Sequence, residues 1–468
     1  MFRFRFMVIL LFAMIVLTSI WAGLRAQSPT PATPPVGPFG LSRISTGDGT
    51  PLDIDTFVSS ETCGVCHERE WKEFNGSMHS AAHGEPLYRG FAELARKEAG
   101  DKMYAFCSGC HSATGVVSGL IPKKHDRELP AEAKAGVSCD VCHQMSRLTG
   151  PEGPWGEPGN ASFTLTAGRV KYAHSGAFQK NRAHSGEQRS FFAKAEYCAS
   201  CHTVIHPING LRIENTYGEW KASIYAQKGI QCQDCHMRNV EEMRKVAETL
   251  QPIVVKGQRV VNGDERDIYR HYFVGGNANA DRLAGGKTQA KMAEAWLQSA
   301  ARIELKTASG YTPGGKLLIE VIVHNVGAGH NLPTGVTELR QIWVDLRISD
   351  QQGKTLFQSG NLDEKGDFAA DSIWFGAVAV DQAGKMTMKP WEMVRLSHKR
   401  TIPPKGALRT PITPELPKDL SGPITIAAKL LYRSAPPSAV ALAMPNKPLV
   451  PTIVEMAKTE TKVARKEN

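Results

Sequence analysis

The sequence predicts a chain of two unlike parts: a mostly α-helical and irregular domain over residues 56–300, and an all-β, sandwich-like domain over residues 301–432. Two observations predict this division. All ten cysteines and most of the fifteen histidines lie before residue 300, in a stretch with little sustained hydrophobic periodicity. After it, apolar and polar side chains alternate, which is typical of half-buried strands.

The helical domain offers two credible helices, at residues 91–106 and 287–305, and is otherwise poor in regular structure. Such a stretch needs a core that its own side chains do not supply. The β domain offers three strands, at residues 317–324, 341–348 and 424–432, with glycine- and proline-bearing turns between them. This pattern predicts a small antiparallel sandwich.

Residues 1–26 are typical of an export segment. Arg3 and Arg5 precede an uncharged apolar run, residues 7–24, which is about the shortest length that spans a bilayer. Two interpretations remain open, a cleaved signal peptide and an uncleaved N-terminal anchor. Under both, the body of the chain is expected in the periplasm or on the outer face of the cytoplasmic membrane.

Proline-rich segments flank the two predicted domains. Residues 27–55 carry six prolines among Ser, Thr and Gly, which predicts a stiff, extended linker without a core of its own. Residues 433–468 carry five prolines and end in a charged stretch. We expect them to form an extended tail that frays on the surface.

The ten cysteines form five Cys-x-x-Cys-His motifs, which we number 1 to 5 in chain order. Two thiols three positions apart can each form a thioether bond to one vinyl group of a haem, and the next imidazole is then directed at the iron as its proximal ligand. The motifs therefore predict five covalently attached c-type haems as cofactors. Motifs 1 to 5 are Cys63, Cys66 and His67; Cys107, Cys110 and His111; Cys139, Cys142 and His143; Cys198, Cys201 and His202; and Cys232, Cys235 and His236.

Two other uses of these cysteines compete with haem attachment. An exported chain could join ten cysteines in five disulfides, and Cys-x-x-Cys pairs could form halves of zinc sites. Neither explains why a histidine follows every pair directly, when only 15 of 468 residues are histidine. Zinc ribbons also use such pairs two at a time, and five is an odd number. We therefore favour haem attachment.

The charge of the chain is basic. The formal net charge is +10, and without the three arginines of residues 1–26 it is +7. A basic face for nucleic acid or anionic lipid is one interpretation. No basic cluster with interleaved aromatic residues is present, so nucleic acid is not expected as a partner. The other interpretation is internal compensation, since haems bring propionate carboxylates into the molecule.

The residues around the motifs resemble the cytochrome c-554/c-552 family of tetrahaem electron carriers over roughly residues 56–205. Residues 63–83 (CGVCHEREWKEFNGSMHSAAH), Gly136-Val137-Ser138 before motif 3 and Glu196-Tyr197 before motif 4 carry this resemblance. Two features depart from the family's pattern. Motif 5 adds a fifth haem, and the β domain with the loop at residues 327–335 resembles a C-terminal module of larger multihaem cytochromes.

The sixth ligand of each iron separates an electron carrier from a catalyst, because two imidazoles leave no open position. The resemblance favours His79 as a distal ligand, with His83 as its near rival. His206 is too close in sequence to His202 to serve the same iron, so it would bind a neighbouring one. His324 and His398 are expected to be structural or exposed. The distal candidates are His79, His184, His206, His271 and His330.

The resemblance also implies an exception, because the family's second haem can be five-coordinate. In this chain that haem is the one on Cys107, Cys110 and His111. His125 is the nearest histidine downstream, in a Pro- and Lys-rich loop that is expected to be exposed. The motif 2 haem is therefore the predicted open site.

These expectations predict a periplasmic electron-transfer cytochrome whose partners are redox proteins, such as a membrane quinol oxidoreductase or other cytochromes. Contact with the membrane is expected only through an N-terminal anchor. Two alternatives remain. A haem enzyme could act on a small nitrogen or sulfur compound at the open haem, although the chain has no Cys-x-x-Cys-Lys motif of the nitrite-reductase kind. The β domain could instead dock the chain into a larger respiratory complex.

Overall fold

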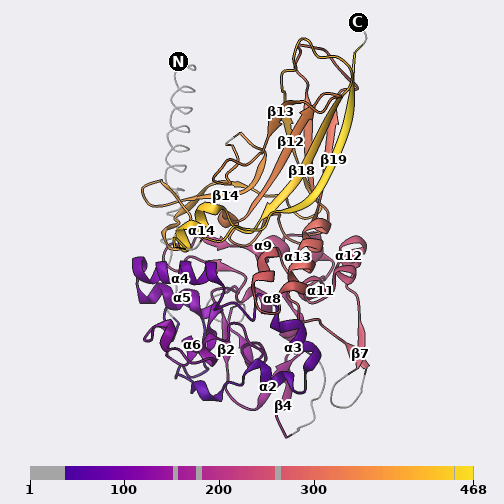
Figure 1. Cartoon of the computed structure of the whole chain (residues 1–468). Coiled ribbons are helices and arrows are strands. Elements are labelled where there is room, and N and C mark those ends of the chain that lie inside the picture. The colour runs from indigo at the N-terminus through magenta and orange to yellow at the C-terminus, as the bar shows by residue number, and fades with distance from the viewer. Residues whose placement is uncertain are drawn as a thin grey trace, which may run out of the picture.

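The computed structural model describes residues 37–150, 156–174, 182–258, 265–369, 371–446 and 448–466. They form two parts, with short helices and loops below and β-sheets above in Figure 1. The predicted fold class, a helical region followed by a β-rich domain, is confirmed. The predicted export segment lies outside the described residues. Within those residues, no helix has both the length and the apolar character needed to cross a bilayer.

The helical part consists of short helices joined by long irregular segments. The predicted helix at residues 91–106 is wrong in extent, because Gly100 adopts a φ of 85° and separates α4 from α5. The predicted helix at 287–305 ends at Ala300, where a strand begins. The helices of this part are α2 (Ser60–Gly64), α3 (Glu68–Asn75), α4 (Pro86–Ala99), α5 (Asp101–His111), α6 (Ala113–Val117), α7 (Cys139–His143), α8 (Ala195–Ala199), α9 (Thr216–Lys221), α10 (Ile224–Gln227), α11 (Gln233–His236), α12 (Val240–Thr249) and α13 (Lys287–Ala300).

Four two-stranded sheets interrupt these helices, and three of them are antiparallel. The exception, β3 with β4, is parallel. Buried apolar side chains of this part fall into several separate clusters, the largest of which lies between residues 44 and 165. The pairs are β1 (Met145–Leu148) with β2 (Phe163–Leu165), β3 (Val170–Ala173) with β4 (Ser185–Gln188), β5 (Val204–Ile205) with β6 (Arg212–Glu214), and β7 (Lys256–Gln258) with β8 (Glu265–Asp267).

The β domain consists of an eight-stranded and a three-stranded sheet. The strand order is β10-β19-β18-β12-β14-β15 in the larger sheet, with β13 on β12 and β16 on β14, and β17-β11-β9 in the smaller one. The strands are β9 (Ala301–Thr307), β10 (Gly310–Tyr311), β11 (Ile319–Asn325), β12 (Gln341–Ser349), β13 (Thr355–Ser359), β14 (Trp374–Val380), β15 (Met386–Thr387), β16 (Arg395–Arg400), β17 (Ala407–Ile412), β18 (Ile424–Arg433) and β19 (Val454–Arg465).

One continuous core holds the two sheets together. Val321 and Val323 of β11 and Val344 and Leu346 of β12 belong to a single buried cluster, so the sheets pack face to face as a sandwich. Alternation explains the pattern, because every second residue of β18 faces this core. The strands predicted at 317–324, 341–348 and 424–432 are present as β11, β12 and β18.

Two predictions about the flanking segments are wrong. In the described part of the 27–55 linker, Ile44 is fully buried, and the backbone of Ser45 exchanges hydrogen bonds with Phe163 and Leu165. The predicted frayed tail contains β19, which pairs with β18 over almost its whole length. The prolines of the tail obscured alternating apolar residues, such as Val454 and Met456, that enter the core.

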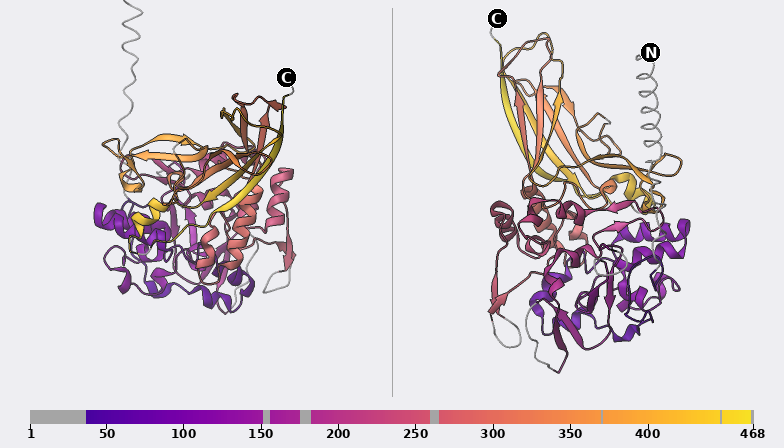
Figure 2. Two further views of the ribbon diagram at one scale, coloured as in Figure 1. Left: turned by 45° about the horizontal axis from the view of Figure 1, so that its top comes forward. Right: turned by 180° about the vertical axis from the view of Figure 1, so that it is seen from behind.

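The two parts meet along a broad seam. Figure 2 shows from two further directions that the β domain sits on one end of the helical part. Helix α13 runs directly into β9, and α14 (Pro437–Ala443) packs on α4, where Gly90 leaves room for the backbone of Ala443. Thr334 Oγ1 donates a hydrogen bond to Glu219 Oε2 at 2.6 Å. Loops of the β domain therefore reach the interior of the helical part.

Candidate cofactor site

Each of the five motifs occupies one helical turn. The backbone N–H of His67, His202 and His236 donates to the carbonyl of the first cysteine of its motif, at 2.9 Å in each case. This turn brings the two thiols and the imidazole of a motif to the same side of the backbone. All ten cysteines are described and each is a free thiol, so the disulfide interpretation has no support in this fold.

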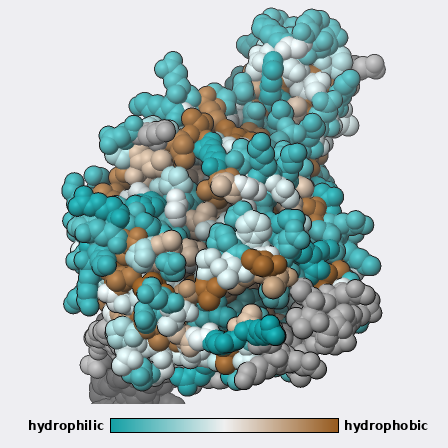
Figure 3. All heavy atoms as spheres, turned by 60° about the horizontal axis from the view of Figure 1, so that its bottom comes forward, coloured by the Kyte–Doolittle hydropathy of each residue, from teal (hydrophilic) through white to brown (hydrophobic). Residues whose placement is uncertain are grey.

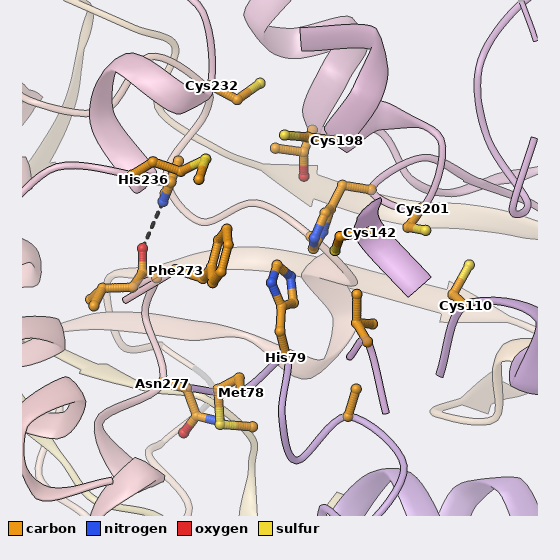
Figure 4. Close-up of a pocket in the computed structure, with 18 of the residues that line it drawn as sticks. Met78, His79, Cys110, Cys142, Cys198, Cys201, Cys232, His236, Phe273 and Asn277 are labelled. Atoms are coloured by element: carbon orange, nitrogen blue, oxygen red, sulfur yellow. Dashed lines mark hydrogen bonds between the residues drawn. The ribbon is translucent and has the colours of Figure 1, made fainter. Parts of the chain in front are cut away.

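The motifs open onto one connected cavity with a volume of about 1780 Å³. All ten cysteines and all five motif histidines line it, and most of the remaining lining is apolar. Ordinary small-molecule sites measure roughly 300–1,000 Å³, so this space suits something larger. Figure 4 shows Cys110, Cys142, Cys198 and Cys201 around the same space as His79. On the face seen in Figure 3, apolar side chains also reach the surface in patches between polar ones.

Four motif histidines each face a second histidine. The distances between ring centres are 6.1 Å in three pairs and 6.5 Å in the fourth. Two imidazoles that bind one metal from opposite sides, with metal–nitrogen bonds of roughly 2.0 Å, have ring centres about 6 Å apart. The spacing therefore fits one iron between the rings of each pair. The pairs are His67 with His184, His202 with His79, His143 with His271, and His236 with His330.

Hydrogen bonds through Nδ1 orient several of these rings. Nδ1 of His111 donates to the carbonyl of Ala82 at 2.9 Å, and Nδ1 of His236 donates to that of Val274 at 2.6 Å, the dashed line in Figure 4. Nδ1 of His143 donates to a carbonyl in the same way, at 2.7 Å. A donating Nδ1 leaves the lone pair on Nε2, which is the nitrogen that can bind a metal.

Burial keeps most of these imidazoles neutral. It lowers the pKa of His79 to about 3 and the pKa values of His111, His236 and His271 to about 4, with nearby histidines adding to the effect in most cases. A neutral imidazole is the form that binds a metal. The residues of this cavity therefore fit c-type haem in three respects: paired thiols, opposed neutral imidazoles and a large apolar space.

His202 of motif 4 differs from the others. Its Nδ1 donates to Oε1 of Glu214 at 3.3 Å, and this carboxylate lies at the end of β6. Burial alone would lower the pKa of His202, but the hydrogen bond and the charge of Glu214 outweigh it and raise that pKa to about 9. In turn, burial would raise the pKa of Glu214, while His202 and the charge of Arg340 hold it below its usual value.

His111 of motif 2 has a different neighbour. The ring of Tyr88 stacks on it with a centre-to-centre distance of 3.8 Å and an angle of 7°. No metal fits between rings this close, so Tyr88 lies beside the imidazole and not across an iron from it. All fifteen histidines belong to the described residues, and among them none faces His111 at the spacing of the four pairs.

The structure thus brings four of the five predicted distal ligands opposite motif histidines: His79, His184, His271 and His330. Gly136, with a φ of 66°, lies against the turn that carries His79, and Val137 N–H donates to the carbonyl of His79 at 2.9 Å. His330 comes from the β domain, in the loop between β11 and β12, so both parts of the chain contribute ligands.

The prediction for His206 does not agree with its placement. Its Nε2 donates to the carbonyl of Trp391 at 3.2 Å, and its Nδ1 accepts from the backbone of Ile208 and Asn209. Both nitrogens are therefore used in a local turn, and we do not retain His206 as a distal ligand. The rival of His79, His83, instead bonds Asp126 at 2.6 Å.

Three further histidines lie away from the pairs. His125 is exposed in its loop, as is His398 on β16. His324 pairs with Glu304 on the neighbouring strand at 3.1 Å. These positions agree with the expectation that such histidines are structural or exposed.

Sequence reasoning missed Glu214 and Tyr88. Glu214 lies in a three-residue strand, and nothing in its sequence surroundings separates it from an exposed glutamate. Tyr88 lies near the start of an ordinary amphipathic helix. The carbonyls that orient the motif histidines carry no sequence signal at all, because every residue has one.

Thiols of different motifs touch each other. A hydrogen bond between thiols joins Cys63 of motif 1 to Cys139 of motif 3, and this contact raises the pKa of Cys63. Similar contacts join Cys110 to Cys201, which links motifs 2 and 4, and Cys198 to Cys232, which links motifs 4 and 5. The motifs are therefore close neighbours. In the described ranges, no three His, Cys, Asp or Glu side chains cluster as a bare metal ion would need, so zinc has no site there.

Comparison with known proteins agrees with this geometry. Residues 62–144 match the family model described as cytochrome c554 and c-prime. The fold is similar to the crystal structure of a penta-heme cytochrome c552 from Thermochromatium tepidum, with a TM-score of 0.60 and 20% sequence identity, over 88% of this chain and 100% of that one. A match to red sea bream transglutaminase covers 46% of this chain and 23% of that one at 12% identity. Its TM-score of 0.16 is too low to indicate a shared fold. No curated protein matches.

Together, the fold, the cavity and the family match over motifs 1 to 3 support a multihaem cytochrome of the c type that transfers electrons. In overall fold the chain is similar to a penta-heme cytochrome c552.

Proposed function

We propose that this chain is an exported c-type cytochrome that carries five haems and passes single electrons through them. One observation carries the proposal: four of the five motif histidines face a second histidine with ring centres 6.1–6.5 Å apart. When bound, haem iron between two imidazoles supplies one-electron exchange with little rearrangement. The protein then acts by holding the groups, not by reacting with a substrate.

The protein residues divide this work among them. The motif cysteines anchor the cofactor, and the opposed histidines fill both axial positions. The Nδ1 hydrogen bonds to the carbonyls of Ala82, Tyr172 and Val274 keep the proximal rings from rotating. Apolar side chains along the cavity exclude water, which limits the reorganisation that a change of charge requires.

Contacts between motifs support electron transfer across the chain. The thiol contacts link motif 1 to motif 3, and they link motif 4 to motifs 2 and 5. Cys142 of motif 3 also lies near enough to Cys198 of motif 4 to affect the pKa of that thiol. Groups bound at adjoining motifs lie close together, so motif 4 would be the junction through which electrons from motifs 1 and 3 reach motifs 2 and 5.

The first test is mass. Mature protein from a host that attaches c-type haem is expected to exceed the mass of its polypeptide by about five haem groups. The variant Cys232→Ala/Cys235→Ala is expected to lose one of the five. A colourless protein with the mass of the bare polypeptide would contradict the proposal.

The second test concerns the distal histidines. The variant His184→Ala is expected to convert one low-spin ferric signal to high spin in electron paramagnetic resonance spectra. The matched variant is His125→Ala, at an exposed histidine of a surface loop, and it is expected to leave the spectrum unchanged. Equal effects of the two variants would remove His184 as a ligand.

A second candidate function arises at motif 2, where His111 stacks on Tyr88 and lacks a facing histidine. The haem on His111 would then keep an open position for a small nitrogen or sulfur compound. Carbon monoxide added to the reduced protein distinguishes the two functions. A Soret shift for one haem in five supports a reactive site, whereas an unchanged spectrum leaves the electron carrier alone.

The location and partners belong to the same proposal. Export follows from residues 1–26, and partners would be redox proteins such as a membrane quinol oxidoreductase or other cytochromes, with the β domain as an alternative docking module. Fractionation of cells that express the full chain is expected to place haem-stained protein in the periplasm or at the inner membrane. Haem-stained protein in the cytosol would contradict it.

A further inference from the structure

Glu214 sets the haem of motif 4 apart from its neighbours by its charge. Among His111, His143, His202 and His236, three donate Nδ1–H to a neutral backbone carbonyl, and only His202 donates to a carboxylate. A carboxylate partner raises the basicity of a metal-bound histidine, because part of its negative charge passes to the imidazole. The hydrogen bond is made to His202 alone, so its effect is largest at motif 4, although the charge of Glu214 also reaches His111 of motif 2.

The fold holds the Glu214 side chain in this position. Glu214 ends β6, and its backbone pairs with Val336 of the β domain. The hydroxyl of Thr216 donates to the same Oε1 atom at 3.5 Å. Only 15% of the side chain is exposed, and it faces the cavity that the motifs share. A buried carboxylate is poorly screened by solvent, so its charge acts strongly on groups nearby.

The opposite side of the same site offers no balancing interaction. His79 faces His202 at 6.1 Å, and its Nδ1 is buried without a hydrogen-bond partner among the described residues. The carboxylate that acts on this pair of imidazoles is that of Glu214, and the charge of Arg340 offsets it in part. Ferric iron carries one more positive charge than ferrous iron, so a nearby anion stabilises the ferric form.

We propose that Glu214 is a positioning residue that gives the haem of motif 4 a lower reduction potential than the haems of motifs 2, 3 and 5, so that it is reduced after them. The proposal rests on the proposed function, since it needs haem at motif 4. Reduction there adds one electron to the iron and leaves the proton on Nδ1 of His202. Because motif 4 adjoins motifs 2, 3 and 5, its haem would hold the electron only briefly and would separate motifs 1 and 3 from motifs 2 and 5.

The test is a redox titration of the holoprotein followed in the visible spectrum. In Glu214→Gln, which removes the charge, the ratio of reduced to oxidised haem at motif 4 is expected to rise about tenfold at a fixed potential, or about 59 mV for one electron. In Glu214→Asp, which keeps the charge but shortens the side chain, a smaller rise is expected. A His79→Met background marks this haem spectroscopically, because it alone changes to histidine–methionine ligation.

The matched control is Glu219→Gln, which neutralises a buried carboxylate five residues away that bonds Thr334 and Lys399 and no histidine. It is expected to leave all potentials in place. Electron paramagnetic resonance gives a second readout, because loss of imidazolate character moves the g values of one low-spin haem only.

Three outcomes would overturn the proposal: unchanged potentials in Glu214→Gln with full haem content, an equal shift in Glu219→Gln, or, if Glu214→Gln loses haem, an unchanged potential in Glu214→Asp. Absence of haem from the unaltered protein would instead refute the proposed function itself.

Discussion

The two parts of this molecule are stabilised in different ways. The β domain has one continuous core, in which side chains of both sheets interlock. The helical part has several smaller clusters arranged around a cavity of about 1780 Å³. Cavities of this size are costly in an apolar interior unless something fills them. The comparison indicates that the β domain folds on its own side chains, whereas the helical part depends on the cofactor that it binds.

The largest expected effect follows directly. Protein made in a host that cannot attach haem is expected to keep a folded β domain while residues 37–300 lose fixed tertiary structure. Limited proteolysis with mass spectrometry measures this, and the holoprotein is the control. Fragments that begin near residue 301 should survive in the haem-free protein and not accumulate in the holoprotein. Equal resistance of both parts without haem would mean that the helical part is self-supporting.

Within the β domain, the same substitution at a buried and at an exposed leucine should have very different effects. Leu430→Ala, at a fully buried side chain of β18, is expected to lower the free energy of unfolding of the β domain by about 2–5 kcal/mol. Leu318→Ala, at a side chain that is 54% exposed, is expected to change it by less than about 0.5 kcal/mol. Denaturant unfolding measures both, and similar losses would argue against the single core.

At the seam, Glu338 should make stability depend on pH. It is 7% exposed, and burial raises its pKa from 4.5 to about 7. Between these values the folded state binds more protons than the unfolded state. The free energy of unfolding is therefore expected to fall by about 3 kcal/mol as pH rises from about 4.5 to about 7. Glu338→Gln should flatten this profile, whereas Glu415→Gln, at an exposed position, should preserve it.

The contrast between the parts also explains what the sequence could predict. Alternation of apolar residues identified β11, β12 and β18, because every second side chain of a strand in a sandwich faces the core. The motif residues could also be predicted from the sequence, because covalent attachment of haem requires a fixed spacing of the two cysteines and the histidine. The path of the helical part could not be predicted in this way, because its helices surround a cofactor and need not carry a complete apolar face. Gly100 also separates two helices that the sequence pattern had predicted as one.

The histidines that face the motif histidines were harder to predict from the sequence. His79, His184, His271 and His330 are 94 to 128 residues from the histidines that they face, so only resemblance and local loop chemistry pointed to them. His206 had the right residue type beside a motif, but backbone groups of its own turn take both nitrogens. Tertiary contacts of single side chains, such as Glu214 with His202, leave no periodic pattern in a sequence.

The smallest expected effect tests whether the two parts unfold together. Thr334→Val keeps the shape of the side chain but removes the hydrogen bond to Glu219, a carboxylate that is 6% exposed. Bonds to charged groups contribute about 1.5–3 kcal/mol, but Lys399 still contacts Glu219 at 3.3 Å. A loss of about 1 kcal/mol is therefore expected, and the control Thr355→Val, on an exposed position of β13, should cost less. Because Thr334 joins the parts and belongs to neither core, calorimetry of the holoprotein should show their transitions moving apart, whereas transitions that keep their separation would mean that this hydrogen bond does not couple the two parts.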